Sequence, residues 1–156
     1  MAKASYPELL NLAAEGPLFG QLMLRDLLLP DLLGKESDAI TYWAGRSLAR
    51  RLPVSEDDLV ALFARVGFGT LALTASKHHQ RTYTLSGTTV ATRMANFAAP
   101  DFRLEAGFLA QSLQQALGHV VEASAAADPH KQLVTLTVIL DEKTPQPRAE
   151  NQITLN

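Results

Sequence analysis

The sequence predicts an α+β fold in which N-terminal helices pack on a twisted antiparallel sheet of about four strands. Three observations lead to this prediction: the first half of the chain has apolar residues at helical spacing, the pattern changes to alternation at Gly67, and a strong helix, 102–117, stands between two predicted hairpins. At 156 residues the chain has the length of one domain. We expect a single domain over 1–140 and a polar C-terminal tail over 141–156.

Composition excludes several classes of protein. Hydrophobic residues make up 47% and charged residues 19%, which argues against a disordered chain, and the formal net charge of -2 argues against a nucleic-acid partner held by charge. The chain contains no cysteine, so disulfides and thiolate metal sites are excluded, as suits a reducing cytoplasm. The sequence shows neither a signal peptide nor a membrane span.

The segment 18–29 has apolar residues all around the predicted helix, and its only polar residues are Gln21, Arg25 and Asp26. A helix that is apolar on every side is buried on every side. Either it is a central core helix or it forms a homodimer contact, and the sequence leaves both alternatives open. The residues expected at a dimer contact are Leu18, Phe19, Leu22, Met23 and Leu27. We expect the helix to end in the stretch 30–34.

The next helix is predicted over 39–51, with a buried stripe of Ile40, Trp43, Ala44, Leu48 and Leu52. Arg46 lies on the flank of that stripe. It could stack on Trp43 or Tyr42 or hold an anionic group of a ligand, although cations near a helix C-terminus are also favoured by the helix dipole alone. A third helix follows Ser55 and ends at Gly67.

After Gly67, the segments 68–76 and 81–86 predict a hairpin. Its turn contains His78 and His79, which are adjacent and would point to opposite faces of a strand, so we expect no metal site there. The segment 88–96 fits either a further strand or a short helix.

The helix 102–117 has a start signal at Asp101 and a stop signal at Gly118. Its main apolar stripe should lie on the sheet, whereas Leu104 and Phe108 fall on the opposite side and predict a second surface to be covered. Strands over 119–126 and 131–140 follow, with a turn at Asp128.

No catalytic motif is present: the sequence lacks a glycine-rich phosphate loop, a nucleophile elbow, an H-E-x-x-H motif and paired carboxylates. Glu105 is the one acidic residue near the apolar shoulder of the long helix, where a pocket would perturb its pKa. The alternative is an ordinary solvated helix carboxylate.

Four ordered blocks carry a family resemblance: 29–34, 40–46, 67–70 and 102–108. Together they resemble the YslB-like family of uncharacterised bacterial proteins over about residues 18–140. The segment from Phe102 onward is also similar to the end of the vinyl-reductase-type ligand-binding domains, a group that includes subunits of the TRAPP vesicle-tethering complexes and is distantly related to the heme domains of nitric-oxide sensing.

The resemblance implies helices on one side of a twisted antiparallel sheet, dimerisation through helices and, in some members, an apolar cavity. Two departures limit it. The cysteines that many of these domains use for metal binding or for a covalent lipid are missing, and no histidine lies in a block that matches the heme domains. We therefore expect no metal or cofactor, and only non-covalent ligands.

The first functional hypothesis is a non-enzymatic, homodimeric cytoplasmic domain that holds a small apolar ligand between the helices and the sheet. The expected lining of that cavity is Tyr42, Trp43, Arg46, Phe68, Phe102, Glu105 and Phe108. The second hypothesis is a scaffold or adaptor that has a closed core and acts through its helical surface.

Overall fold

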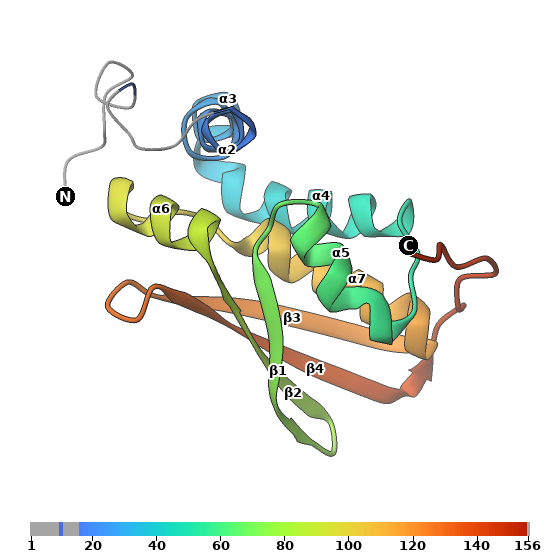
Figure 1. Ribbon diagram of the computed structural model, residues 1–156. Coiled ribbons are helices and arrows are strands. Elements are labelled where there is room, and N and C mark those ends of the chain that lie inside the picture. The colour runs from blue at the N-terminus through green and yellow to red at the C-terminus, as the bar shows by residue number, and fades with distance from the viewer. Residues whose placement is uncertain (1–9, 11–15, 156) are drawn as a thin grey trace.

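A computed structural model describes Leu10 and residues 16–155. The strands β1 (Thr70–Lys77), β2 (Gln80–Ser86), β3 (His119–Asp128) and β4 (Leu133–Pro145) form one antiparallel sheet in the order β1-β2-β4-β3. Two hairpins are thus joined side by side through β2 and β4 (Figure 1). The helices cover one face of this sheet, which confirms the predicted fold.

The long helix α7 (Arg103–Leu117) lies between two layers. One side packs on the sheet through its apolar stripe, and the other is covered by α4 (Ser37–Arg50) (Figure 1). α5 (Leu59–Arg65) packs on β1 and brings Phe63 against Phe108 of α7. Leu104 and Phe108 are buried on that second side. The second surface predicted from the sequence is therefore present.

Two glycines let α4 and α7 cross at very short range. A Cβ atom on Gly45 would stand 2.0 Å from the carbonyl oxygen of Leu104, and one on Gly107 would stand 2.0 Å from that of Tyr42. Any side chain at either position would push the helices apart.

The close crossing reverses the predicted orientation of α4. Its buried residues are Thr41, Gly45, Arg46 and Ala49, whereas Trp43 is 59% exposed and Ile40 and Leu48 are more than 40% exposed. The large apolar residues Ile40, Trp43 and Leu48 of the stripe predicted to be buried therefore face outward. The small residues that allow the contact with α7 occupy the opposite side of the helix.

The N-terminal helical run contains α2 (Pro17–Leu22), the π-helical segment η1 (Met23–Leu28) and α3 (Leu29–Leu33). We had expected the helix to end from Pro30 onward, but the helical run continues past Pro30 to Leu33. In a regular α-helix its ring would clash with the carbonyl of residue 26, and the wider π turn immediately before it avoids that clash. The run ends at Gly34, which has φ 59°.

The remaining segments complete the framework. Short 3₁₀ turns, η2 (Gly34–Glu36) and η3 (Glu56–Asp58), precede α4 and α5, and α6 (Thr88–Asn96) is the short helix left open by the sequence. β4 continues to Pro145, five residues beyond the predicted strand. The chain after it returns over the helices, where the Ile153 amide donates a hydrogen bond to the Pro53 carbonyl. Among the described residues, no helix has the length and apolarity needed to cross a bilayer.

Candidate ligand-binding groove

Aromatic side chains fill the space between the helices and the sheet. Phe63, Phe68 and Phe108 form a cluster of edge-to-face contacts with ring centroids 5.2–5.6 Å apart. Phe102 is also buried, with its ring under the Arg93 guanidinium at 4.4 Å. Phe68, Phe102 and Phe108, which were expected to line a cavity between the helices and the sheet, thus pack in the core there.

Arg46 connects α4 to β3. Its guanidinium donates hydrogen bonds to the Val121 carbonyl at 2.9 Å and the Gln114 side-chain oxygen at 2.8 Å. The Tyr42 hydroxyl, which accepts from Arg46, donates to Glu122. Burial, followed by the hydrogen bond to Glu122, raises the pKa of Tyr42. This polar cluster has a structural role, and Trp43 beside it points to solvent.

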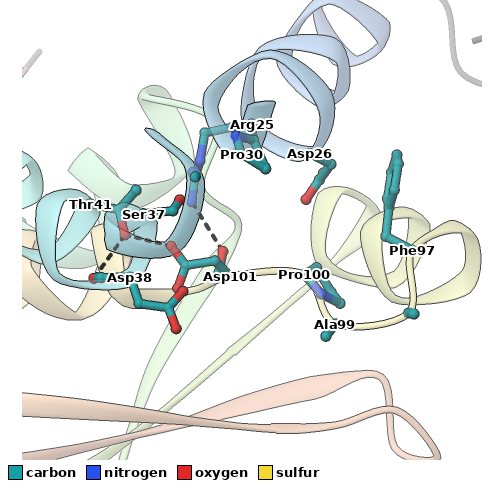
Figure 2. A pocket seen from close by; sticks show the side chains of 12 residues that line it. Arg25, Asp26, Pro30, Ser37, Asp38, Thr41, Phe97, Ala99, Pro100 and Asp101 are labelled. Atoms are coloured by element: carbon teal, nitrogen blue, oxygen red, sulfur yellow. Dashed lines mark hydrogen bonds between the residues drawn. The ribbon is translucent and has the colours of Figure 1, made fainter. Parts of the chain in front are cut away.

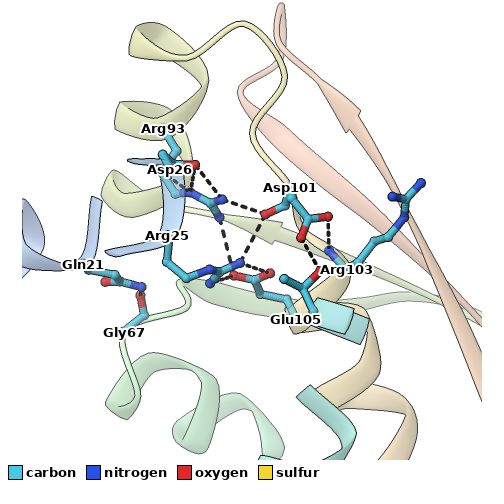
Figure 3. Close-up of polar contacts among 9 residues, drawn as sticks. Gln21, Arg25, Asp26, Gly67, Arg93, Asp101, Arg103 and Glu105 are labelled. Atoms are coloured by element: carbon cyan, nitrogen blue, oxygen red, sulfur yellow. Dashed lines mark hydrogen bonds and ion pairs between the residues drawn. The ribbon is translucent and has the colours of Figure 1, made fainter. Parts of the chain in front are cut away.

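Glu105 lies in a buried ion-pair network between η1, α6 and α7 (Figure 3). Its carboxylate accepts two hydrogen bonds from Arg25, at 2.6 and 3.0 Å, and lies 3.5 Å from Arg93. Arg93 also pairs with Asp26. Burial favours the neutral acid, but the charges of Arg25 and Arg93 outweigh it, so the pKa of Glu105 is lowered. The carboxylate stays ionised at neutral pH.

The seven residues expected around one cavity are therefore distributed over the aromatic core, the α4–β3 cluster and the ion-pair network. One of them, Phe68, lines a groove elsewhere, on the outside of the helical layer. We call this space the helical groove. It lies between α2–η1, α4 and the end of α5 and has a volume of about 770 Å³.

The helical groove is mainly apolar. Phe68 and Leu104, each 8% exposed, contribute to its lining together with exposed leucines of the surrounding helices. Among the residues that the structure describes, its lining consists of Pro17, Gly20, Gln21, Leu24, Arg25, Leu29, Leu48, Arg65, Val66, Gly67, Phe68 and Leu104. A volume of about 300–1,000 Å³ with few polar groups is typical of small-molecule sites.

Two polar contacts hold α2–η1 in the position that forms this groove. The Gln21 side-chain amide donates to the Gly67 carbonyl at 3.0 Å, which ties α2 to the loop after α5. Four residues later, Arg25 binds Glu105 on α7 (Figure 3). The groove is thus formed by side chains that have defined partners.

A second pocket of about 380 Å³ lies on the other side of Arg25, between α3, the start of α4 and the loop before α7 (Figure 2). Its lining is more polar and includes Asp26, Asp38 and Asp101. The Asp101 carboxylate accepts a hydrogen bond from Thr41 at 2.6 Å. Arg25 belongs to the walls of both spaces.

The structure also changes the set of residues available for a dimer contact. Leu22 and Leu27 are 1% and 2% exposed because they pack against Phe97, and Leu18 and Phe19 lie partly buried on the same cluster. Of the five residues expected at a contact, Met23 is the one whose side chain is exposed. The outward side of the run carries Met23, Leu24, Leu28 and Leu32.

A sequence signal for the groove did exist. The polar residues of this apolar run are Gln21, Arg25 and Asp26. All three lie on the side of the run that packs against the rest of the protein. Polar residues at this spacing in an apolar helix indicate a polar contact with a neighbouring element as readily as a solvated face. Leu48 carried no such signal, because its exposure depends on the glycine contact of α4.

The described residues contain no cluster of three histidine, cysteine or acidic side chains suited to a metal ion. His78 and His79 occupy the exposed turn between β1 and β2.

Helices on one face of a four-stranded antiparallel sheet place the protein in the vinyl-4-reductase-like fold class. Its fold is similar to the crystal structure of a vinyl-4-reductase family protein from Methanocaldococcus jannaschii, with a TM-score of 0.56 over 87% of this chain and 88% of that one. The sequence identity is 18%, so this likeness shows the fold alone.

The family follows from the sequence. The model for "Protein of unknown function (DUF2507)" matches residues 18–139, and the chain belongs to this family. The uncharacterised protein YslB of Bacillus subtilis (strain 168) is 34% identical over 124 residues, which span 79% of this chain and 84% of that protein. The predicted relationship to YslB is thereby confirmed.

Proposed function

We propose that this protein is a non-enzymatic cytoplasmic binding domain that holds a small apolar ligand in the helical groove. The observation that carries the proposal is the groove itself, which has the volume of a small-molecule site and is lined mainly by apolar side chains. Relative to the sequence-based hypothesis, the ligand moves from between helices and sheet to the outer side of the helices.

Solvent exposure of apolar groups in the groove supports this proposal. Leu24 is 54% and Leu48 is 44% exposed, and both line the same groove. An apolar ligand would remove these surfaces from water, which stabilises the complex by roughly 25 cal/mol per Å² of apolar surface buried before the costs of binding are subtracted.

The test uses the neutral fluorescent probe N-phenyl-1-naphthylamine. We expect the wild-type protein to bind it, and Leu48→Glu to weaken binding by about tenfold or more because a carboxylate would replace an apolar wall. Ile40→Glu is the matched control, since Ile40 lies on the same helix with 43% exposure but outside the groove lining. Equal binding by both variants would contradict the assignment.

We propose further that two copies associate through the outward side of α2–η1–α3. Leu24, Leu28 and Leu32 follow one another at intervals of four residues, and Leu32 is 69% exposed. Apolar stripes of this kind on helices commonly mark protein contacts. Because Leu24 also lines the groove, the ligand site would lie beside this contact.

The alternative function, a scaffold with a closed core, has one specific observation in its favour. The aromatic cluster of Phe63, Phe68 and Phe108 fills the space between helices and sheet. A protein that fails to bind the naphthylamine probe but still self-associates would support this alternative.

A further inference from the structure

The charges in the helical groove indicate the class of ligand it takes. Within the described part of the chain, the charged residues of its lining are Arg25 and Arg65, and both are cationic. Given the proposed function, on which this inference rests, we propose that the ligand is an amphipathic anion: an alkyl chain that ends in a carboxylate.

Arg25 is suited to bind the carboxylate. A guanidinium has five N–H donors, and three donate to protein acceptors: two to Glu105 and one to the Asp101 carbonyl. Within the described residues this leaves two donors for a further acceptor, and the Arg25 side chain is 9% exposed. A carboxylate at this point would form charge-assisted hydrogen bonds.

The same contacts hold the guanidinium in place before a ligand arrives. Arg25 is fixed by both oxygens of Glu105, and Glu105 is held from a second direction by Arg93 at 3.5 Å. A positioned guanidinium loses little conformational entropy on binding a carboxylate. The buried ion-pair network thus acts as a support for the anion-binding group.

The rest of the groove suits the alkyl chain. Leu24 and Leu29 belong to one wall, Leu48 and Val66 to the walls formed by α4 and α5, and Phe68 to the lining between them. Arg65 lies in the last turn of α5, where it adds positive charge to the lining. An amphiphile with a cationic end would therefore meet like charge.

The experiment compares three displacers of N-phenyl-1-naphthylamine that share one chain length: dodecanoate, dodecanol and dodecyltrimethylammonium, all below the concentrations at which they form micelles. We expect dodecanoate to displace the probe at about tenfold lower concentration than dodecanol, because it adds charge-assisted hydrogen bonds. The cationic amphiphile should be the weakest of the three.

A paired substitution isolates the contribution of Arg25. Arg25→Gln together with Glu105→Gln removes one positive and one negative charge at once, so no buried charge loses its main partner. The readout is the ratio of dodecanoate to dodecanol affinity, because any displacement of α2–η1 in this double variant would weaken both ligands alike. We expect the ratio of about ten in the wild type to fall to about one in the double variant. Should it fail to fold, Arg65→Gln provides the second test, with a smaller and salt-sensitive loss of dodecanoate affinity.

The outcomes separate this inference from the proposed function. If probe and dodecanol bind but dodecanoate has no advantage, or if its advantage persists in the double variant, the anionic ligand class is wrong and the apolar site stands. If neither the probe nor any amphiphile binds the wild type, both proposals fail.

Discussion

Glu105 shows how far the surroundings of one residue decide its role. From the sequence, this glutamate was interpreted either as an ordinary solvated helix carboxylate or as a residue that faces a pocket with a perturbed pKa. In the structure it is 1% exposed and paired with Arg25 and Arg93. Its partners come from segments 80 and 12 residues earlier in the chain, which no local pattern could reveal.

The paired state of Glu105 predicts a specific pH dependence. Because its pKa is lowered in the folded protein, its contribution to stability is fully present above its unfolded pKa of about 4.3 and is lost as the pH falls through the folded value. Glu105→Gln should cost about 3–5 kcal/mol at pH 7, since it leaves buried arginine charge unpaired. Urea unfolding should show this difference shrinking below about pH 4.3, and a difference that stays constant down to pH 3 would contradict the ionised pair.

At the scale of elements, the contact between α4 and α7 determines which face of each helix is free. The long helix was predicted correctly, including its second buried side, because both of its apolar sides are visible in the sequence. α4 was predicted with the wrong face inward. Its orientation is determined by Gly45 and Gly107, which lack a side chain and so let the two helix backbones come into contact. Hydrophobic periodicity does not register a contact made by glycines.

Gly107→Ala tests this contact. The added Cβ would lie 2.0 Å from the Tyr42 carbonyl oxygen, so we expect a loss of roughly 1–3 kcal/mol or more in the free energy of unfolding. Gly20→Ala is the control: its Cβ meets nothing within 4 Å, and replacing a helical glycine should stabilise by roughly 0.5–1 kcal/mol. Similar effects of the two substitutions in thermal or urea unfolding would argue against a close crossing.

The same contact explains how much of the site the sequence could predict. Phe68, one of the residues named from the sequence, lies in the lining of the groove, and Arg25 was noted only as a polar residue. The groove also needs Leu48 turned outward and α2–η1 fixed by Gln21 and Arg25. These arrangements depend on the glycine crossing and on long-range ion pairs. The fold class and the family were accessible from the sequence, whereas the site required the packing.

For the whole molecule, the helical layer presents apolar surface outward while the core beneath it is filled. This distribution connects the two proposals, a groove for an apolar ligand and a contact between copies beside it.

Self-association is tested with Leu32→Glu. Leu32 is 69% exposed and outside the groove lining, so the monomer should keep its stability within about 0.5 kcal/mol. We expect native mass spectrometry to show a dimer for the wild type and for the control Leu73→Glu, which places the same charge on the exposed side of β1. A monomeric wild type, or a Leu32→Glu variant that dimerises as strongly, would exclude this contact.

The most direct test of the groove is a dodecanoate titration of ¹⁵N-labelled protein followed by amide chemical shifts. We expect saturable shifts concentrated on the amides of Gly20, Leu24, Leu48 and Gly67, with small changes around the aromatic core and on the outer face of the sheet. Saturable shifts centred on the loop before α7 or on the sheet would contradict the assignment of the helical groove. The absence of any saturable shift would contradict ligand binding itself.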